Sequence, residues 1–259
     1  KSYFTGMIGD VGIGVMLAFI GLYYSANCIV YGTSDFSIVL YSTTIAMLFV
    51  LPALSMRSFA DERRNKTDQL LLTSPVTIPQ IVLGKYLAQL VIFAVPVLVA
   101  CVMPLILTAF GTVSLLSAYA SLLAYFLLGA ACIAVGTFIS VLTENQIIAY
   151  LATFGLLLLS YLMNDIKPLF TTGNTLAFIV FCVILVVAAA LVGLVCKSLT
   201  VGCGVFCAGA VLLIVLFQLR PTWLLNGFNA VLDALALFAP FDDFVGGMFS
   251  VPDIVYYLS

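Results

Sequence analysis

The side chains able to do chemistry are few in this chain, and none of them forms a known catalytic set. The sequence has no histidine, which excludes a serine–histidine hydrolase, an HExxH zinc site and any histidine-ligated metal centre. Gly9-Asp10 fits half of the Gly-x-Gly-Asp motif of an intramembrane aspartyl hydrolase, but residue 7 is methionine. No second aspartate lies in the middle of an apolar run. We therefore expect the chain not to be an enzyme.

Cysteine is the other residue type with chemical potential. The chain has seven cysteines, all in or beside apolar runs: Cys28, Cys101, Cys132, Cys182, Cys196, Cys203 and Cys207. In such surroundings a thiol usually serves as a small hydrophobic side chain. Cys203 and Cys207 would share a helix face, but no histidine or nearby carboxylate completes a ligand set. We expect neither a metal site nor a disulfide framework.

Charge is concentrated in one stretch, Arg57 to Lys85. Within it, Asp61 to Leu72 can form a short amphipathic helix in which Glu62 and Lys66 pair at i, i+4. The chain then stops this helix and turns back through Ser74-Pro75, Pro79 and Gly84-Lys85. The basic residues by themselves would serve as topology determinants. A rigid helix held between two apolar runs is in addition a surface on which a soluble partner can act.

The elements that position this stretch must be membrane helices. Hydrophobic residues make up 64% of the chain and charged residues only 8%, against about a quarter in an ordinary globular domain. Several apolar runs reach the roughly 18 to 20 residues needed to cross the bilayer, and a helix satisfies its own backbone hydrogen bonds there. The net charge of −2 does not favour nucleic acid as a partner. We predict an all-α polytopic membrane protein, with residues 1–259 forming a single transmembrane domain in the lipid bilayer.

The apolar runs predict seven spans. They cover approximately Gly9–Val30, Phe36–Met56, Tyr86–Phe110, Ser117–Leu142, Ile147–Met163, and two further segments within 174–219. Pro96 and Pro104 should kink the third span. The fourth and fifth spans are joined by a tight hairpin, and a polar loop, Asn164 to Asn174, follows the fifth.

Beyond these spans, residues 222–249 predict a helix lying in the interface plane, with Trp223 at a suitable depth. Residues 1–8 read as the end of an interfacial helix, and Ser250 to Ser259 as the first turns of a truncated eighth span. Alternation of the spans places the 57–85 loop and most basic residues on one side, with only Lys167 and Arg220 on the other. By the positive-inside rule the loop and the amino terminus are cytosolic, and the 222–249 helix is extracellular.

Ion- or proton-coupled transport normally needs ionisable residues deep in the spans. Here the span centres offer only hydroxyls, glycines and Gln89, and the ionisable residues lie at or near span ends: Asp10, Asp35, Glu144, Asp165 and Lys197. We expect the energy for any transport to enter through the cytosolic loop instead.

Several segments of the sequence resemble those of a known family. The segments Phe59–Val76 and Ile81–Lys85 resemble the signature of type-2 ABC transporter permeases, in the branch of gliding-motility-associated permease subunits. Gly136–Gln146 is similar to that branch's junction between the fourth and fifth spans. Lys1–Phe4 and Ile254–Ser259 are similar to its amino-terminal elbow and the start of its last span.

The resemblance implies a permease that pairs with a second permease copy or a paralogue and docks cytosolic ABC ATPase subunits, which carry ATP and Mg. It implies that the 57–85 loop holds a coupling helix, with Glu62, Arg63 and Arg64 at its start and Ser74-Pro75 at its exit. The residues assigned to ATPase coupling are Glu62, Arg63, Arg64, Thr67, Leu70, Leu71, Leu72, Ser74, Pro75, Gly84 and Lys85. A second cytosolic loop comprises Thr143, Glu144, Asn145 and Gln146.

On this basis we expect the permease subunit of an ATP-driven exporter in a bacterial cytoplasmic membrane, with no cofactor bound to the chain itself and an extracellular auxiliary protein as a further partner. The alternatives are a membrane scaffold or regulatory subunit that transports nothing, and a secondary transporter. Nothing in the sequence identifies the substrate, the substrate-binding residues or the direction of transport.

Overall fold

A computed structural model describes residues 7–33, 35–64, 77–109, 113–170, 236–246 and 251–258. All regular structure in these ranges is helical. Five helices are long and apolar enough to cross a membrane: Gly9–Val30, Phe36–Arg64, Ile78–Thr108, Leu115–Leu142 and Gln146–Met163. The prediction of an all-helical polytopic membrane protein is therefore confirmed. The predicted sixth and seventh spans lie outside the described residues.

The first span combines two kinds of helix. Helix α1, Met7–Tyr24, continues as a π-helix, η1, Ser25–Val30. After η1 the backbone N–H and the hydroxyl of Thr33 both donate to the carbonyl oxygen of Asn27, at 3.1 and 2.8 Å. Gly32, between η1 and Thr33, has a φ of +67°, a conformation that glycine adopts without a steric cost. The chain can therefore end one helix and begin the next within a few residues.

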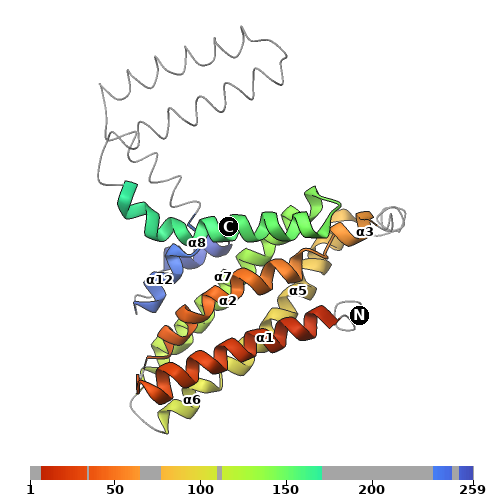
Figure 1. Ribbon diagram of the computed structural model, residues 1–259. Coiled ribbons are helices and arrows are strands. Elements are labelled where there is room, and N and C mark those ends of the chain that lie inside the picture. Colours follow the sequence, from red (N-terminus) through yellow and green to blue (C-terminus); the bar gives the residue numbers. More distant parts are fainter. Residues whose placement is uncertain are drawn as a thin grey trace, which may run out of the picture. The chain divides into compact units, whose positions relative to one another are not determined.

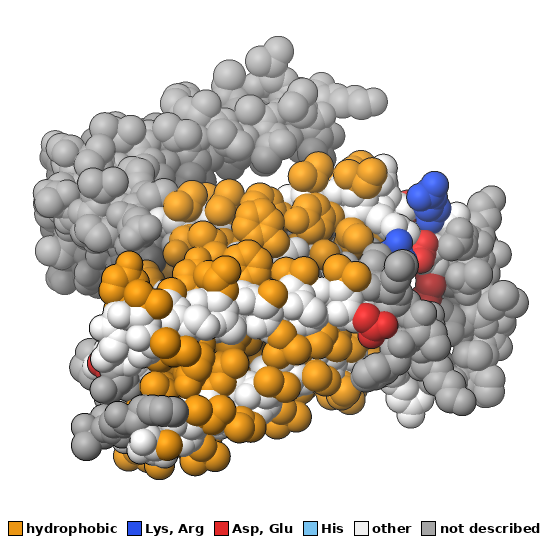
Figure 2. Space-filling view, turned by 60° about the horizontal axis from the view of Figure 1, so that its bottom comes forward, with side chains coloured by type: hydrophobic (Ala, Val, Ile, Leu, Met, Phe, Trp, Pro, Cys, Tyr) orange, Lys and Arg blue, Asp and Glu red, His pale blue; other side chains and the backbone are white. Residues whose placement is uncertain are grey.

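Helices α2, Phe36–Ser55, and α7, Leu115–Leu142, form the centre of the described bundle. Helix α2 packs against α1 and α7, and α7 also contacts α5, Ile78–Ala100 (Figure 1). Leu40, Met47 and Leu51 of α2 and Leu128 and Ile133 of α7 are completely buried or nearly so. The face of the bundle shown in Figure 2 is largely hydrophobic, as expected for helices whose solvent is lipid.

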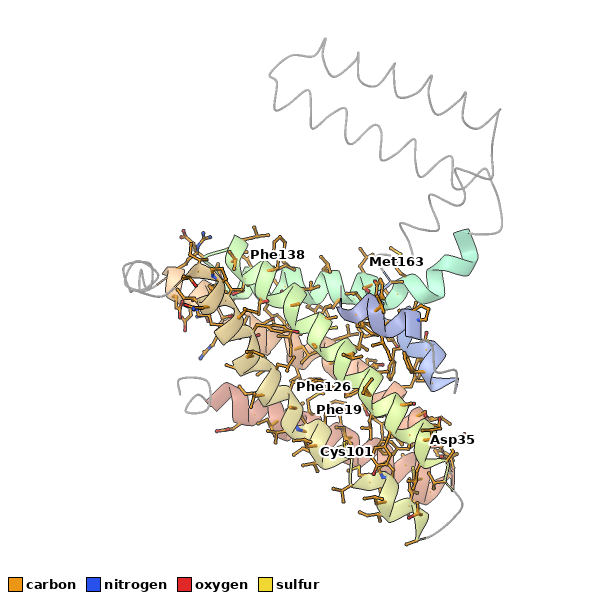
Figure 3. All side chains as sticks on the ribbon, turned by 180° about the vertical axis from the view of Figure 1, so that it is seen from behind. Phe19, Asp35, Cys101, Phe126, Phe138 and Met163 are labelled. Carbon is orange, nitrogen blue, oxygen red and sulfur yellow. The ribbon has the colours of Figure 1, made fainter. Side chains whose placement is uncertain are left out.

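An aromatic seam joins α5, α7 and α12, Ala239–Val245, where Phe93, Tyr125, Phe126 and Phe241 meet. Successive ring centroids are 6.0 to 6.1 Å apart, and Figure 3 labels Phe126 at this place. Gly129 packs directly against the Phe93 ring, which leaves no space for a Cβ atom. Nearby, Ser121 pairs with the Ser37 hydroxyl at 2.9 Å and donates to the carbonyl oxygen of Phe244 at 3.3 Å.

The helix predicted to begin near Tyr86 begins earlier. Helix α5 starts at Ile78, so Pro79, Gly84 and Lys85 lie inside it and the prediction that Pro79 precedes the span as part of a loop is wrong. Proline is tolerated in the first turn of a helix because the N–H groups there have no intrahelical acceptor. The side chain of Gln80 completes this start by accepting the Thr77 N–H at 3.1 Å.

The predicted disturbance at Pro104 is confirmed. Helix α5 ends at Ala100, and a separate short helix, α6, runs from Met103 to Thr108. The ring of a proline clashes with the carbonyl group four residues earlier, which here belongs to Ala100. Pro96 lies within α5 without ending it.

Two further boundaries differ from the sequence-based expectation. Helix α8 runs from Gln146 to Phe170, so the first part of the predicted 164–174 loop is helical. The predicted continuous helix over 222–249 is wrong at 236–238, which are not helical. Helix α12 begins at Ala239 because Pro240 fits a first turn but not a helix interior. Residues 222–235, with Trp223, lie outside the described residues.

Helix α12 also differs in burial from the surface helix predicted there. Phe238, Phe241 and Phe244 are at most 3% exposed, and α12 packs against α7 and α2. The last described element, α13, runs from Val251 to Leu258 and also contacts α7. A helix is thus present where the eighth span was predicted to begin.

Candidate coupling site

The polar contacts of interest gather where α2 leaves the apolar bundle. Helix α2 ends at Ser55, a turn follows, and α3 runs from Ala60 to Arg64. We call the α3 end the region formed by residues 55–64 with the adjacent parts of α5 (85–89) and of α7 and α8 (140–146). Figure 2 shows Lys and Arg side chains at this end of the visible face. In Figure 3 the labelled Phe138 lies near the α3 end and Asp35 at the opposite end.

Ser140 of α7 holds the turn between α2 and α3. Its Oγ accepts hydrogen bonds from the backbone N–H groups of Phe59 at 3.0 Å and Ala60 at 3.1 Å. The same hydroxyl donates to the carbonyl oxygen of Met56 at 3.2 Å. The first N–H groups of a helix have no intrahelical acceptor. Ser140, a side chain from another span, therefore supplies the hydrogen-bond acceptor that α3 lacks for its first N–H groups.

Lys85 of α5 reaches the same turn from another side. Its Nζ forms an ion pair with Glu62 and donates to the carbonyl oxygen of Ser58 at 2.6 Å. The ammonium group also lies over the Phe59 ring, 4.0 Å from its centroid, in the geometry of a cation–π contact. The Lys85 side chain is only 13% exposed. A charge so enclosed needs its partners, because burial removes most of its hydration.

Gln89, one helical turn after Lys85, is fully buried. Its amide Nε2 donates to Ser58 Oγ at 3.0 Å and to the carbonyl oxygen of Lys85 at 3.3 Å. Its Oε1 has no hydrogen-bond partner among the residues that the structure describes. Lys85 and Gln89 together attach Ser58, in the turn before α3, to α5.

The second predicted loop meets the first one. Gln146 Nε2 donates to Asp61 Oδ1 at 2.5 Å, and Arg63 Nη1 donates to the carbonyl oxygen of Val141 at 2.6 Å. The loop itself is short because Thr143 Oγ1 donates to the Asn145 carbonyl oxygen at 2.9 Å, and Asn145 Oδ1 accepts the N–H of Ile147 at 3.0 Å. The tight hairpin predicted between the fourth and fifth spans is present.

The structure therefore brings together four residues that the sequence assigned to two separate loops: Glu62, Arg63, Lys85 and Gln146. Arg64 and Glu144 are exposed at the same end, and Gly84 lies in α5 with open space around it. The predicted pairing of Glu62 with Lys66 cannot be compared, because Lys66 lies outside the described residues. The same holds for the following predicted coupling residues: Thr67, Leu70, Leu71, Leu72, Ser74 and Pro75.

Sequence reasoning missed several members of this network, among them Ser58, Phe59, Asp61 and Ser140. Ser58 and Ser140 are small polar residues near span ends, a pattern with no spacing that reveals partners 27 to 84 residues away. Gln89 did give a signal, as the only amide in a span centre. No group of three or more potential metal ligands occurs among the residues that the structure describes. The arrangement joins α3 and the turn before it to α5, α7 and α8.

The comparison with known families agrees with this arrangement. A model of the ABC-2 family transporter protein matches residues 30–172, more than half of the chain. The match runs from the end of η1 to the end of α8 and includes the whole α3 end. No curated protein and no solved structure gave a significant match. The chain is a multi-pass membrane protein that belongs to the ABC-2 transporter family.

Proposed function

We propose that this chain is the permease subunit of an ATP-driven exporter and that its α3 end receives the movement of a partner ATPase. The branch we propose is that of the gliding-motility-associated permeases, on the resemblance of 59–85 and 136–146. ATP and Mg bind to the partner, and this chain has no enzymatic activity of its own. The family match supports a permease subunit.

One observation carries the coupling role: α3 is joined by polar contacts to three membrane helices. Lys85 joins it to α5, Ser140 to α7 and Gln146 to α8. A displacement of α3 therefore acts on these spans through the contacts. For this displacement to drive transport, the ATPase must interact differently with two conformations of the permease.

The proposed orientation places the α3 end and the amino terminus in the cytosol of a bacterial cell. The four basic side chains that the structure describes, Arg57, Arg63, Arg64 and Lys85, all belong to the α3 end, as the positive-inside rule favours for a cytosolic surface. A second copy of the permease or a paralogue completes the transporter, and an extracellular auxiliary protein is a further expected partner.

The burial pattern favours an external energy source over ion coupling. Among the residues that the structure describes, every buried polar side chain is an uncharged serine, threonine or glutamine. Secondary transporters normally carry ionisable groups within the membrane. ATP hydrolysis in a separate subunit agrees with this pattern.

The test is to purify the permease from its native membrane and to identify the ATPase that accompanies it. Glu62→Ala with Arg63→Ala should lower the permease-dependent part of the ATPase rate in reconstituted membranes. The matched control is Asp35→Asn, which removes an exposed charge at the opposite end and should leave the rate unchanged. If no ATPase accompanies the permease and the double variant leaves membrane ATPase activity unchanged, the chain is instead a scaffold or regulatory subunit.

A further inference from the structure

Ser140 uses its whole hydrogen-bonding capacity on the corner between α2 and α3. A hydroxyl group has one proton and two lone pairs, and here the proton goes to Met56 while the lone pairs take the N–H groups of Phe59 and Ala60. Ser140 is fully buried. Water cannot replace the hydroxyl in this place without a rearrangement of the helices.

The surface of α7 beside Ser140 follows the same corner. One turn earlier, Gly136 lies so close to Ser55, the last residue of α2, that a Cβ atom would overlap the serine side chain. One residue after Ser140, the carbonyl oxygen of Val141 accepts a hydrogen bond from the guanidinium of Arg63. Helix α7 thus contacts the end of α2, the turn and α3 itself.

The contacts that α5 makes to the same corner are of a different kind. Lys85 and Gln89 reach it with long side chains, which have several rotatable bonds and can keep their contacts while the helices shift. A serine hydroxyl is one bond away from Cβ and has a single χ angle. It cannot follow a moving backbone, so the α7 contact is the stiff one.

We propose that Ser140 is the positioning residue through which movement of α3 is transmitted to α7 during transport. This inference rests on the proposed function, because it assumes that a partner ATPase displaces α3. It goes further by naming the span that moves with α3 and the side chain that makes the connection. The α5 contacts then guide α3 without forcing α5 to move with it.

The experiment compares Ser140→Ala with Thr137→Ala in the permease–ATPase complex reconstituted in lipid nanodiscs. Thr137 is also a buried hydroxyl of α7, but it donates to the Ala134 carbonyl of its own helix at 2.8 Å and, among the residues that the structure describes, forms no hydrogen bond with α3. Ser140→Ala should reduce the permease-dependent maximal ATPase rate about tenfold, which corresponds to the loss of one or two buried hydrogen bonds. The ATP Michaelis constant and the amount of copurified ATPase should stay unchanged, because the buried Ser140 contacts neither ATP nor the ATPase.

Thr137→Ala should behave as wild type in all three measurements. Ser140→Cys serves as a second variant because it fills nearly the same volume with a weak donor and acceptor, and it should fall between wild type and Ser140→Ala. Equal rates in Ser140→Ala and Thr137→Ala would overturn the proposal, as would a wild-type rate in Ser140→Cys. Absence of ATPase from the wild-type complex would instead refute the proposed function, a failure seen before any variant is made.

Discussion

The α3 end and the aromatic seam connect some of the same helices by different means. At the seam, α5, α7 and α12 meet through the rings of Phe93, Tyr125, Phe126 and Phe241. At the α3 end, α5 and α7 meet the turn before α3 through directed hydrogen bonds and an ion pair. Ring packing has no single preferred partner atom, whereas each hydrogen bond specifies two atoms. The seam therefore holds the helices together, and the α3 end fixes their positions relative to one another.

The largest effect should come from overfilling the seam. Gly129→Leu places a side chain where the buried Phe93 ring already lies, and overpacking of this kind costs about 3 kcal/mol. We expect the detergent-solubilised protein to lose its folded, monodisperse fraction on heating at a clearly lower temperature. Gly155→Leu is the control, because open space surrounds Gly155 in α8. Equal melting of the two variants would show that the seam is not tightly packed.

The next largest effect should come from removing the charge that joins α5 to α3. Lys85→Ala deletes the ion pair with Glu62 and the hydrogen bond to Ser58. We expect a loss of about 1–2 kcal/mol, since the Glu62 side chain keeps part of its exposure to water. Hydrogen exchange of the peptide covering residues 56–64 should accelerate, while a seam peptide around Tyr125 should not change. Arg57→Ala removes an exposed positive charge nearby and is the control.

A smaller effect should follow Ser121→Ala, which tests polar contacts on the seam side. Ser121 connects α7 to Ser37 of α2 and to the Phe244 carbonyl, and such interhelical hydrogen bonds in membranes contribute about 1 kcal/mol. We expect the thermal midpoint to fall slightly while the permease-dependent ATPase rate stays at the wild-type value. Ser42→Ala, whose hydroxyl donates to Ile38 within its own helix, should change neither. A reduced ATPase rate in Ser121→Ala would remove the distinction between the two regions.

The smallest effect should come from Gln146→Ala, which removes the donor to Asp61. The contact lies at the partly exposed edge of the α3 end, so we expect a loss of about 0.5–1 kcal/mol. The measurement is the exchange rate of amides in residues 60–64, which should rise less than in Lys85→Ala. Gln146→Glu tests the sign, since a second carboxylate beside Asp61 should raise the rate further than Gln146→Ala does.

The sequence predicted the first five spans well because lipid imposes one strong rule, an apolar run long enough to cross it. Gly9–Val30 was predicted with the bounds that the first candidate span has. Two of the errors occur at prolines. Pro79 was read as part of a loop and Pro240 was overlooked, although each lies in the first turn of a helix. Glu62, Arg63 and Lys85 could be proposed from the charged loop and the family resemblance. Ser140 could not, because its role depends on which backbone groups another span leaves without partners.

The π-helix at the end of the first span has a consequence for which side of that span faces the protein. Along α1 the buried positions Gly12, Met16 and Ile20 recur every four residues, but the next one in this span is Cys28. A π-helical turn contains an extra residue, so the four-residue recurrence is kept through η1, where Cys28 follows Ile20 by eight residues. Cys28 returns to the interior while Ile29 and Val30 face outward, at 70% and 76% exposure. The span thus keeps the same face toward the interior without exposing unpaired backbone groups to lipid.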